Sequence, residues 1–324
     1  MAIMEVKNLS VIYHASGKRV AAVSDVSLTI EERDAIGIVG ESGSGKSTLA
    51  MAILRLLPER IAQAQGEVSF EGADLLTLPA EKLNQLRWKQ LAVVFQKSMN
   101  ALSPVHKIGM QMTDVYRIKE TGISKRETRS KMLQLLDMVN LPERVYDLYP
   151  HELSGGMMQR VAIALSLMHN PKLLILDEAT TALDVVTQGQ ILEEMVALEQ
   201  KLGITRMMIT HDMSVVASSC NKVAVMYAGR ILETGLVKDV LANPVHPYTK
   251  GLLKSIPSFT GEKRNIRGIP GSIPDLSVPN DGCIFAERCE HAMDSCLIEK
   301  PQDMVLPGNH RVACHLAGGA AYVS

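Results

Sequence analysis

Gly40-Glu41-Ser42-Gly43-Ser44-Gly45-Lys46-Ser47-Thr48 is a glycine-rich turn between an apolar run, Ala35–Val39, and an expected helix that starts at Lys46. Strand, turn and helix in this order match the pattern G-x-x-x-x-G-K-[ST] and favour a phosphate-binding loop over a glycine-rich turn without a ligand. Glycines let backbone N–H groups turn toward phosphate oxygens, and the helix N-terminus adds partial positive charge. We expect Lys46 to contact the terminal phosphates of ATP and Ser47 to ligate Mg²⁺. The other residues expected around the phosphates are Gly40, Ser42, Gly43, Ser44, Gly45 and Thr48.

The chain on either side of this loop alternates between apolar runs typical of strands and periodic stretches typical of helices. Residues 3–36 read as short strands separated by polar turns. Strands that alternate with helices predict an α/β fold in which a largely parallel sheet is covered by helices. The expected strands are Leu91–Phe95, Lys172–Leu176, Arg206–Thr210 and Lys222–Tyr227, and the expected helices are Lys46–Leu57, Glu81–Lys89, Lys125–Val139 and Gln188–Leu202.

Two acidic residues, Asp177 and Glu178, follow the apolar strand at Leu173–Leu176. The strand lies deep in the predicted sheet, so both carboxylates emerge at its C-terminal edge, where open α/β sheets bind ligands. We expect Asp177 to hold Mg²⁺ and Glu178 to orient or polarise an attacking water. Taken alone, the pair also fits one helix-capping acid beside one solvated acid. The phosphate loop upstream favours the catalytic interpretation.

A second turn of the same chemical kind occurs at Leu153-Ser154-Gly155-Gly156-Met157-Met158-Gln159-Arg160. A Ser-Gly-Gly turn that opens a helix creates another anion-binding helix terminus. One ATP needs only one phosphate loop. Ser154, Gly155 and Gly156 are therefore expected to contact an ATP that another subunit holds.

Together these motifs resemble the ABC ATPase family, both in their residues and in their order along the chain. The resemblance implies an ABC-type P-loop core with N-terminal antiparallel strands and a helical subdomain. It also implies that Gln96 senses Mg²⁺ and the attacking water, and that His211 contacts the γ-phosphate. The resemblance places Asp184, in Ala182-Leu183-Asp184, in a loop that crosses a dimer interface, and Tyr13 against adenine. The implied catalytic set is Lys46, Gln96, Glu178 and His211, with Ser47, Gln96 and Asp177 as Mg²⁺ ligands.

Three further segments resemble the oligopeptide/dipeptide importer branch of this family: Pro150–Met157, Asn243–Thr249 and Gly268–Pro274. That branch implies a second ATP-binding subunit of related sequence, two integral-membrane permease subunits and, indirectly, an extracytoplasmic solute-binding protein. The transported solute is left open among peptides, oligosaccharides and nickel. The chain departs from the branch at Gln96-Lys97-Ser98-Met99, in place of Gln-Asp-Pro-Met, and at Ala179, where proline is common.

Four of the five cysteines, Cys283, Cys289, Cys296 and Cys314, cluster near the end of the chain. Four thiolates fit either Zn²⁺ or an iron–sulfur cluster, and their spacing lacks the paired C-x2-C knuckles usual for zinc. The importer branch carries a [4Fe–4S] cluster on a cysteine set of this form, so the resemblance implies a cluster here. Zinc and free thiols are the alternatives. Cys220 is expected to be an ordinary buried thiol.

The amino-acid composition argues against one class of function and indicates where in the cell the protein acts. The chain has 34 Lys and Arg against 35 Asp and Glu, and aromatic residues make up 4%. This balance argues against a nucleic-acid partner, because such proteins usually carry a basic excess and base-stacking aromatic residues. The apolar runs are too short to span a membrane, and the start lacks a secretory pattern. We therefore expect a peripheral protein at the cytoplasmic face of the cell membrane.

The expected domains are a nucleotide-binding domain at 1–255, with a helical subdomain at about 97–165, and a Pro/Cys-rich, irregular extension at 256–324. A soluble ABC machine is less consistent with the sequence, which has neither long coiled coils nor a second cassette. Four cysteines on one short appendage are also too little to predict a redox protein with an incidental nucleotide site.

Overall fold

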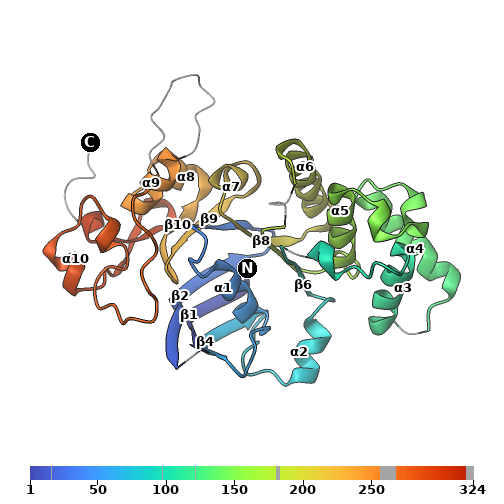
Figure 1. Ribbon diagram of the computed structural model, residues 1–324, viewed down its shortest axis with the longest axis horizontal. Helices are drawn as coiled ribbons and strands as arrows, with labels where there is room; N and C mark the ends of the chain where they lie inside the picture. Colours follow the sequence, from blue (N-terminus) through green and yellow to red (C-terminus); the bar gives the residue numbers. More distant parts are fainter. Residues whose placement is uncertain (16, 97, 121, 180–182, 256–267, 319–324) are drawn as a thin grey trace. The chain divides into compact units, whose positions relative to one another are not determined.

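The computed structural model describes residues 1–15, 17–96, 98–120, 122–179, 183–255 and 268–318. The chain divides into two compact units, shown together in Figure 1. Unit 1 combines Met1–Leu78 with Met208–Ser324, and unit 2 is Pro79–Met207. Within the described ranges, no helix combines the length and the apolar composition needed to cross a membrane.

The first sheet of unit 1 is antiparallel and has the strand order β2-β1-β4-β5. Residues 3–36 do not form the short strands expected, because β1 and β2 are each 14 residues long. Asn8 and Asp25 lie at irregularities in the strand pairing, have positive φ, and are joined by a 2.8 Å hydrogen bond. The polar residues that read as turns are thus β-bulges inside continuous strands. The strands are β1 (Ala2–Ala15), β2 (Lys18–Glu31), β4 (Ala62–Phe70) and β5 (Ala73–Asp74).

The second group of strands in unit 1 has the order β11-β12-β10-β9-β3. Strands β3 and β9 are parallel, whereas β10, β12 and β11 add antiparallel pairs at one edge. Figure 1 shows α7, α8 and α9 on one side of β9 and β10, with α1 and the N-terminal sheet on the other. The strands are β3 (Ala35–Val39), β9 (Lys222–Tyr227), β10 (Arg230–Leu236), β11 (Asp303–Leu306) and β12 (His310–Ala313). The helices are α1 (Lys46–Ile53), α7 (Met213–Ser219), α8 (Val237–Ala242) and α9 (Pro247–Lys254).

The C-terminal extension contains more regular structure than its proline content predicts. Strand β12 pairs with β10 at Glu233 and Val312, so the extension continues a sheet of unit 1. It also contains the short helix α10 (Asp294–Ile298) and the 3₁₀ turn η4 (Ala286–Arg288). The predicted boundary at residue 256 falls on 256–267, which lie outside the described residues, and remains a prediction.

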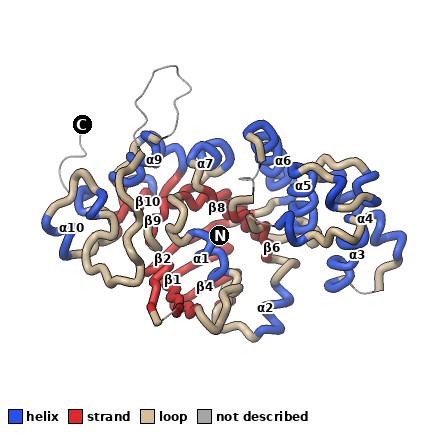
Figure 2. Tube along the Cα trace, in the orientation of Figure 1, coloured by secondary structure: helices blue, strands red, loops and turns tan. Residues whose placement is uncertain are grey.

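Unit 2 lies in the chain between the two segments of unit 1 and contains α2 to α6, which Figure 2 draws in blue. Its strands β6 (Leu91–Val94) and β7 (Leu173–Asp177) are parallel, and β7 is buried along its whole length. Strand β8 (Thr205–Thr210) begins in unit 2 and ends in unit 1. Lys97, where the helical subdomain was expected to begin, lies outside the described residues. The helices of unit 2 are α2 (Ala80–Leu86), α3 (Ile108–Lys119), α4 (Lys125–Met138), α5 (Gly155–Ser166) and α6 (Val185–Leu202).

Local sequence explains why these helices begin where they do. Ser124 and Glu127 form a capping box at the start of α4, and the side chains of Ser154 and Asp184 cap α5 and α6. Each cap satisfies backbone N–H groups that the first helical turn leaves without partners. The α/β class with parallel strand pairs and an antiparallel N-terminal sheet is confirmed.

Candidate functional site

The predicted phosphate loop lies in unit 1, between the end of β3 and the start of α1. Its glycines are required by the surrounding backbone. A Cβ atom at Gly40 would lie 1.9 Å from the carbonyl oxygen of Met226, and one at Gly45 would lie 2.3 Å from that of Ala22. Gly45 also has φ of 98°, a conformation that other residues rarely adopt. The loop is therefore fixed against its own unit.

Lys46 is buried beneath this loop, with 4% of its surface exposed. Its Nζ donates to the carbonyl oxygens of Gly40 and Glu41, both at 2.8 Å, and to Ser44 Oγ at 3.3 Å. The backbone N–H of Glu41 donates to the hydroxyl of Tyr248, at 2.9 Å. Tyr248 was missed by sequence reasoning as a site residue, although it lies in the Asn243–Thr249 segment.

The remaining loop residues differ in how open they are to solvent. Ser42, Gly43 and Ser47 are exposed, whereas Ser44 is buried and Thr48 is half-buried. The backbone N–H of Ser44 donates to the carbonyl of Glu41, so the turn closes on itself. The exposed residues leave one side of the loop accessible to a ligand.

Tyr13 and His211 are the other predicted site residues in unit 1. Tyr13 is half-buried near the end of β1 and pairs with Val20 of β2, two positions before Ala22, whose carbonyl oxygen lies against Gly45. His211 is exposed and directly follows β8. The next residue, Asp212, caps α7 by accepting from the backbone N–H of Ser214 at 2.8 Å.

In unit 2, the structure brings Gln96 and Glu178 together. Gln96 Nε2 donates to Glu178 Oε2 at 2.7 Å. The parallel register explains this contact, because Val94 pairs with Leu176 and both site residues lie two positions further along their strands. Glu178 has φ of 48°, which is strained for a residue that is not glycine, and such strain is concentrated at functional positions. Asp177 is buried at the end of β7.

The Ser-Gly-Gly turn at Ser154, Gly155 and Gly156, which we call the signature turn, and the segment around Asp184 are neighbours within unit 2. A Cβ atom at Gly156 would lie 2.8 Å from Thr187 Cγ2. Asp184 accepts from the backbone N–H of Thr187 at 3.0 Å and from its hydroxyl at 2.7 Å. These hydrogen bonds lower the pKa of Asp184, the backbone bond most. Ala182 lies outside the described residues.

The face that carries this second turn is open. Ser154 is exposed, and its Oγ accepts from the backbone N–H of Met157 at 3.3 Å. A Cβ atom at Gly155 would meet only Leu183 Cδ2, at the ordinary contact distance of 3.6 Å. The adjacent Val185 and Val186 are 85% and 70% exposed. The helix terminus predicted to bind an anion thus lies beside an exposed apolar pair.

The cysteines predicted to hold a cluster lie near one another in the extension of unit 1. Cys283, Cys296 and Cys314 are buried, and the N–H of Cys283 donates to the carbonyl of Cys296 at 2.7 Å. Burial raises the pKa of Cys283 to about 11, and the thiols of Cys296, Cys314 and Cys289 add to the increase. Burial also raises the pKa of Cys289 and Cys314. Among the described residues, no three His, Cys, Asp or Glu side chains are grouped closely enough to hold a single metal ion. The cluster therefore stays a prediction.

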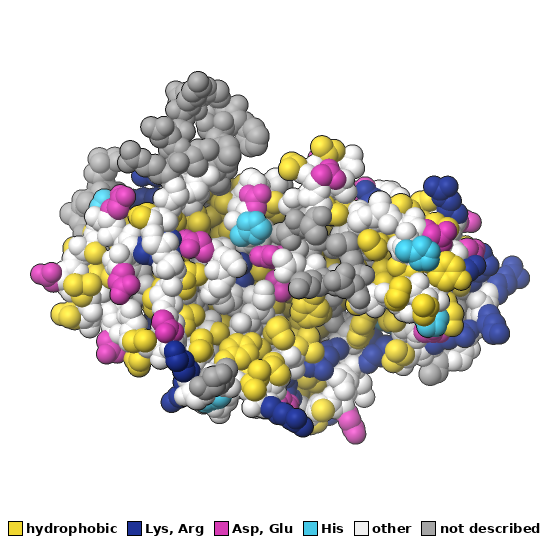
Figure 3. Space-filling view, viewed as in Figure 1, with side chains coloured by type: hydrophobic (Ala, Val, Ile, Leu, Met, Phe, Trp, Pro, Cys, Tyr) yellow, Lys and Arg dark blue, Asp and Glu magenta, His cyan; other side chains and the backbone are white. Residues whose placement is uncertain are grey.

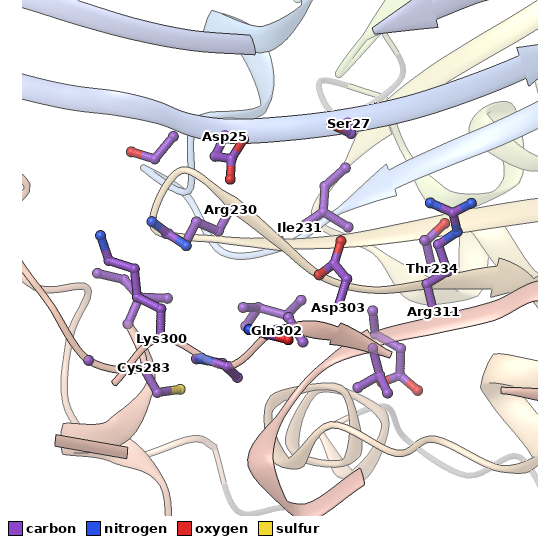
Figure 4. Close-up of a pocket in the computed structure, with 18 residues that line it drawn as sticks. Asp25, Ser27, Arg230, Ile231, Thr234, Cys283, Lys300, Gln302, Asp303 and Arg311 are labelled. Atoms are coloured by element: carbon purple, nitrogen blue, oxygen red, sulfur yellow. The ribbon is translucent and has the colours of Figure 1, made fainter. Parts of the chain in front are cut away.

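Sequence reasoning also missed a polar cavity of ≈ 550 Å³ in unit 1. Figure 4 shows Arg230 and Lys300 on one side of this cavity and Arg311 with Thr234 on the other. Cys283, from the predicted cluster set, lies at its edge. The cavity is lined by β2, β10 and the extension, and it shares no residue with the phosphate loop.

Comparison with known protein families gives two matches. The ABC transporter family matches residues 23–181, which include the phosphate loop, Gln96, the signature turn and Glu178. The oligopeptide/dipeptide transporter C-terminal region matches residues 232–296, which include Cys283, Cys289 and Cys296.

Individual relatives match along nearly the whole chain. A putative peptide import ATP-binding protein of Brucella melitensis is 42% identical over 96% of this chain and 94% of its own length. The oligopeptide transport ATP-binding protein OppD of Escherichia coli is 42% identical over 97% of this chain and 93% of its own length.

Solved structures agree with these sequence matches. A dimeric bacterial ABC transporter cassette has a TM-score of 0.65 and 30% identity, and it covers 72% of this chain and 98% of its own. The cbiO1 protein of Clostridium perfringens has a TM-score of 0.64 and 28% identity, with 75% and 91% coverage. A post-hydrolysis state of the first cassette contains ADP and Pi.

Proposed function

We propose that this chain, which belongs to the ABC transporter family of ATPases, uses ATP hydrolysis to power the import of peptides. Relatives named for peptide import share 42% of their residues with it over nearly its full length. The match to the oligopeptide/dipeptide C-terminal region supports the same branch. ATP hydrolysis is the activity of the family. The peptide cargo and the site residues are our proposal.

The hydrogen bond between Gln96 and Glu178 is the observation that carries the catalytic part of this proposal. Glu178 acts as the group that orients and polarises the attacking water, and Gln96 holds its carboxylate at a fixed strand end. Lys46 binds the terminal phosphates when it exchanges its contacts to the loop carbonyls for contacts to ATP. His211 contacts the γ-phosphate, and Tyr13 stacks on adenine.

Mg²⁺ fits the chemistry of the oxygen donors in the proposed set. Ser47 offers an exposed hydroxyl, Asp177 a carboxylate and Gln96 a side-chain amide oxygen. When bound, Mg²⁺ would neutralise phosphate charge.

A second ATP-binding subunit is proposed as the partner of the signature turn. Ser154 is exposed, and a Cβ atom at Gly155 would meet only Leu183 Cδ2, at 3.6 Å. The exposed Val185 and Val186 beside Asp184 form an apolar surface that a partner subunit would cover. In this arrangement the phosphate loop of one subunit and Ser154–Gly156 of the other contact the same ATP. The related chain that supplies the second loop is of the same family.

Two integral-membrane permease subunits are proposed to contact unit 2 at the cytoplasmic face of the membrane. Val105, just before α3, and Met110, in the first turn of α3, are 73% and 51% exposed. Figure 3 shows Lys and Arg side chains gathered over α3 and α4 of this unit. An apolar pair beside basic helices suits a protein surface close to a membrane.

The cargo is tested on the assembled transporter. The complex is purified with its solute-binding protein, and ATP hydrolysis is measured with peptides, oligosaccharides or nickel. We expect peptides to stimulate hydrolysis. Stimulation by an oligosaccharide or by nickel alone would overturn the peptide assignment and leave the ATPase assignment intact.

The catalytic assignment is tested by Glu178→Gln in the same complex. Removing the carboxylate should lower ATP hydrolysis at least about 100-fold, the usual minimum contribution of general acid–base catalysis, while ATP stays bound. Glu193→Gln, a neutral replacement on α6, is the control and should leave hydrolysis unchanged. Unchanged hydrolysis in Glu178→Gln would remove Glu178 from the mechanism.

A [4Fe–4S] cluster held by Cys283, Cys289, Cys296 and Cys314 is the final part of the proposal. Cys289, Cys296 and Cys314 lie close enough to Cys283 to add to the rise of its pKa, and this proximity of four thiols supports a shared ligand. A tetrahedral zinc ion, with Zn–S bonds of about 2.3 Å, would draw its four sulfurs into one tight group. In a cluster each thiolate ligates a different iron, so a looser grouping suits it better. When bound, the cluster would link the segments of the extension covalently.

Iron, sulfide and zinc assays on the purified complex test this part. We expect iron and sulfide in comparable amounts, together with visible absorption that Cys289→Ser removes. Cys220→Ser is the control and should retain both. Zinc without iron, or four free thiols by titration, would contradict the cluster.

A further inference from the structure

A side chain of the C-terminal extension reaches into the phosphate loop. Arg288, the last residue of η4 and the neighbour of Cys289, forms a two-pronged ion pair with Glu41. Nη1 lies 3.0 Å from Glu41 Oε2, and Nη2 lies 3.1 Å from Glu41 Oε1. Glu41 is the second residue of the loop. A pair that spans 247 positions in the sequence thus connects the extension to the loop.

All five N–H groups of the Arg288 guanidinium have acceptors. Besides Glu41, they donate to the carbonyl of Pro270 at 2.7 Å, the carbonyl of Ile269 at 3.2 Å and the Tyr227 hydroxyl at 3.2 Å. The side chain is only 6% exposed. Such a fork is geometrically specific, and the compact ammonium of lysine cannot reproduce it.

The guanidinium group of Arg288 packs over two aromatic rings. Its central carbon lies 5.4 Å from the ring centroid of Tyr227 and 6.0 Å from that of Phe285. Tyr248, whose hydroxyl accepts the backbone N–H of Glu41, packs against both rings. These packed rings therefore hold Arg288 in place. Salt screens the ion pair between Arg288 and Glu41 less than it screens a pair on the surface.

Glu41 in turn contacts the lysine of the loop. Its carbonyl oxygen accepts from Lys46 Nζ at 2.8 Å, so Arg288, Glu41 and Lys46 form a continuous chain of contacts. The Glu41 carboxylate is 30% exposed and carries negative charge at the edge of a loop that binds anions. An uncompensated carboxylate at this position would repel the phosphates of a nucleotide.

The segment before η4 covers the same loop. Ile273 Cδ1 would lie 3.7 Å from a Cβ atom at Gly43, and the carbonyl of Leu276 accepts from the N–H of Ala21 in β2. Gly271, with φ of 80°, lies under the Arg288 side chain, where a Cβ atom would be 3.2 Å from Cγ. The extension thus approaches the phosphate loop and its neighbouring strand at several points, and Arg288 makes the charged contact.

We propose that Arg288 is a positioning residue for nucleotide binding, which neutralises and fixes Glu41 so that the phosphate loop accepts ATP. This inference rests on the proposed assignment of Gly40–Thr48 as the nucleotide site. It makes the extension a determinant of ATP affinity, and it places that determinant one peptide bond from a proposed cluster ligand, Cys289.

The test is the affinity of the assembled transporter for a fluorescent ATP analogue, together with kcat and KM for ATP. Arg288→Gln should raise Kd and KM about tenfold, as expected for one unscreened charge near the phosphates, with a smaller effect on kcat. Glu41→Gln alone should change Kd less than about threefold, because it removes the repelling charge as well. The double variant should return to the value of Glu41→Gln.

Salt and a conservative replacement separate this role from a purely structural one. The defect of Arg288→Gln should shrink as ionic strength rises, because salt screens an exposed carboxylate. Arg288→Lys should give an intermediate affinity, because it keeps the charge and loses the fork. If Arg288→Gln does not assemble, this lysine variant and the double variant still decide the question. Equal losses in both single variants, without rescue in the double variant, would overturn the proposal.

Two further variants serve as controls. Lys222→Gln breaks an ion pair of similar length, 2.8 Å to Asp34, at the opposite end of β3, and should leave ATP affinity unchanged. Lys46→Ala should abolish binding. If Lys46→Ala still binds ATP, the assignment of the loop fails, and this result is distinct from a failure of Arg288.

Discussion

The phosphate loop and the signature turn are both glycine-rich turns that open a helix, yet their surroundings differ. In the phosphate loop, Lys46 and Ser44 are buried, and backbone atoms of the same unit exclude any side chain at Gly40 and Gly45. In the signature turn, Ser154 is exposed, and a Cβ atom at Gly155 would make only an ordinary contact, 3.6 Å to Leu183 Cδ2. The phosphate loop is enclosed by residues of its own unit, whereas the signature turn presents the groups predicted to bind an anion to solvent.

This difference indicates which turn serves its own subunit and which serves a partner. A helix terminus that binds an anion alone benefits from a rigid, enclosed loop, because pre-organisation lowers the cost of binding. A terminus that contacts a ligand on another subunit has to remain accessible until that subunit arrives. The exposed Val185 and Val186 beside the open turn fit the second case.

The largest expected effect separates the two turns by function. Lys46→Ala should weaken ATP binding by the isolated chain at least about 100-fold, because it removes a charged contact to phosphate. Gly155→Asp should leave binding by the isolated chain unchanged, but should lower hydrolysis by the assembled transporter by a similar factor. It places a negative charge where the partner's ATP is expected. Equilibrium binding and ATP hydrolysis measure the two effects.

Gln85→Glu is the matched control for this pair of variants. Gln85 is exposed on α2, so a new negative charge there should affect neither measurement. If Gly155→Asp weakened ATP binding by the isolated chain, the signature turn would contact the chain's own nucleotide. The assignment of this turn to a partner's nucleotide would then be wrong.

A smaller effect separates the two turns by stability. Gly40→Ala should lower the free energy of unfolding by about 2 kcal/mol or more, because its methyl group collides with the backbone at Met226. Gly155→Ala should change it by less than about 1 kcal/mol, in the stabilising direction, since alanine is the better helix former. Urea unfolding measures both. A similar loss in the two variants would mean that the signature turn is as enclosed as the phosphate loop.

Much of the proposed catalytic geometry could be predicted from the sequence, because it depends on local pattern. Asp177 and Glu178 were expected at the C-terminal edge of the sheet, and the family resemblance singled out Gln96 at the end of another apolar strand. The register of β6 and β7 brings Gln96 and Glu178 to 2.7 Å. The glycine-rich turns were likewise expected at helix starts, and both occupy such positions. Strand ends and helix caps are set by neighbours in the sequence.

The features that were missed depend on distant parts of the chain. The bond between Arg288 and Glu41 joins segments 247 positions apart, so spacing gives no sign of it. The length of β1 was missed because Asn8 reads as a turn residue, whereas its partner Asp25 on β2 turns it into a bulge. The sheet formed by β10 and β12 was missed because the prolines of the extension suggested irregular structure.

A third effect separates the enclosed region around the phosphate loop from the open region around the signature turn by pH. His246, at the start of α9, is buried beside Phe285, and burial lowers its pKa to about 4. Its Nδ1 accepts the backbone N–H of Tyr248 at 3.0 Å, a bond that protonation of Nδ1 would remove. The unfolded chain binds this proton below pH 6.5, whereas the folded chain resists it until about pH 4. Stability should therefore fall as pH drops through this window, by at most about 3 kcal/mol.

Asp184, which caps α6 beside the signature turn, should keep its charge over the same pH range. Hydrogen bonds from Thr187 lower the pKa of Asp184 from 3.8, so its carboxylate stays charged and keeps capping α6. His246→Asn retains an acceptor for the cap and removes the titrating group, so it should flatten the pH dependence of unfolding between pH 6.5 and 4. Asp184→Asn should leave that dependence as it is. Thermal unfolding between pH 6.5 and 4 measures both variants. If His246→Asn kept the same dependence of stability on pH, a group other than His246 would be responsible for it.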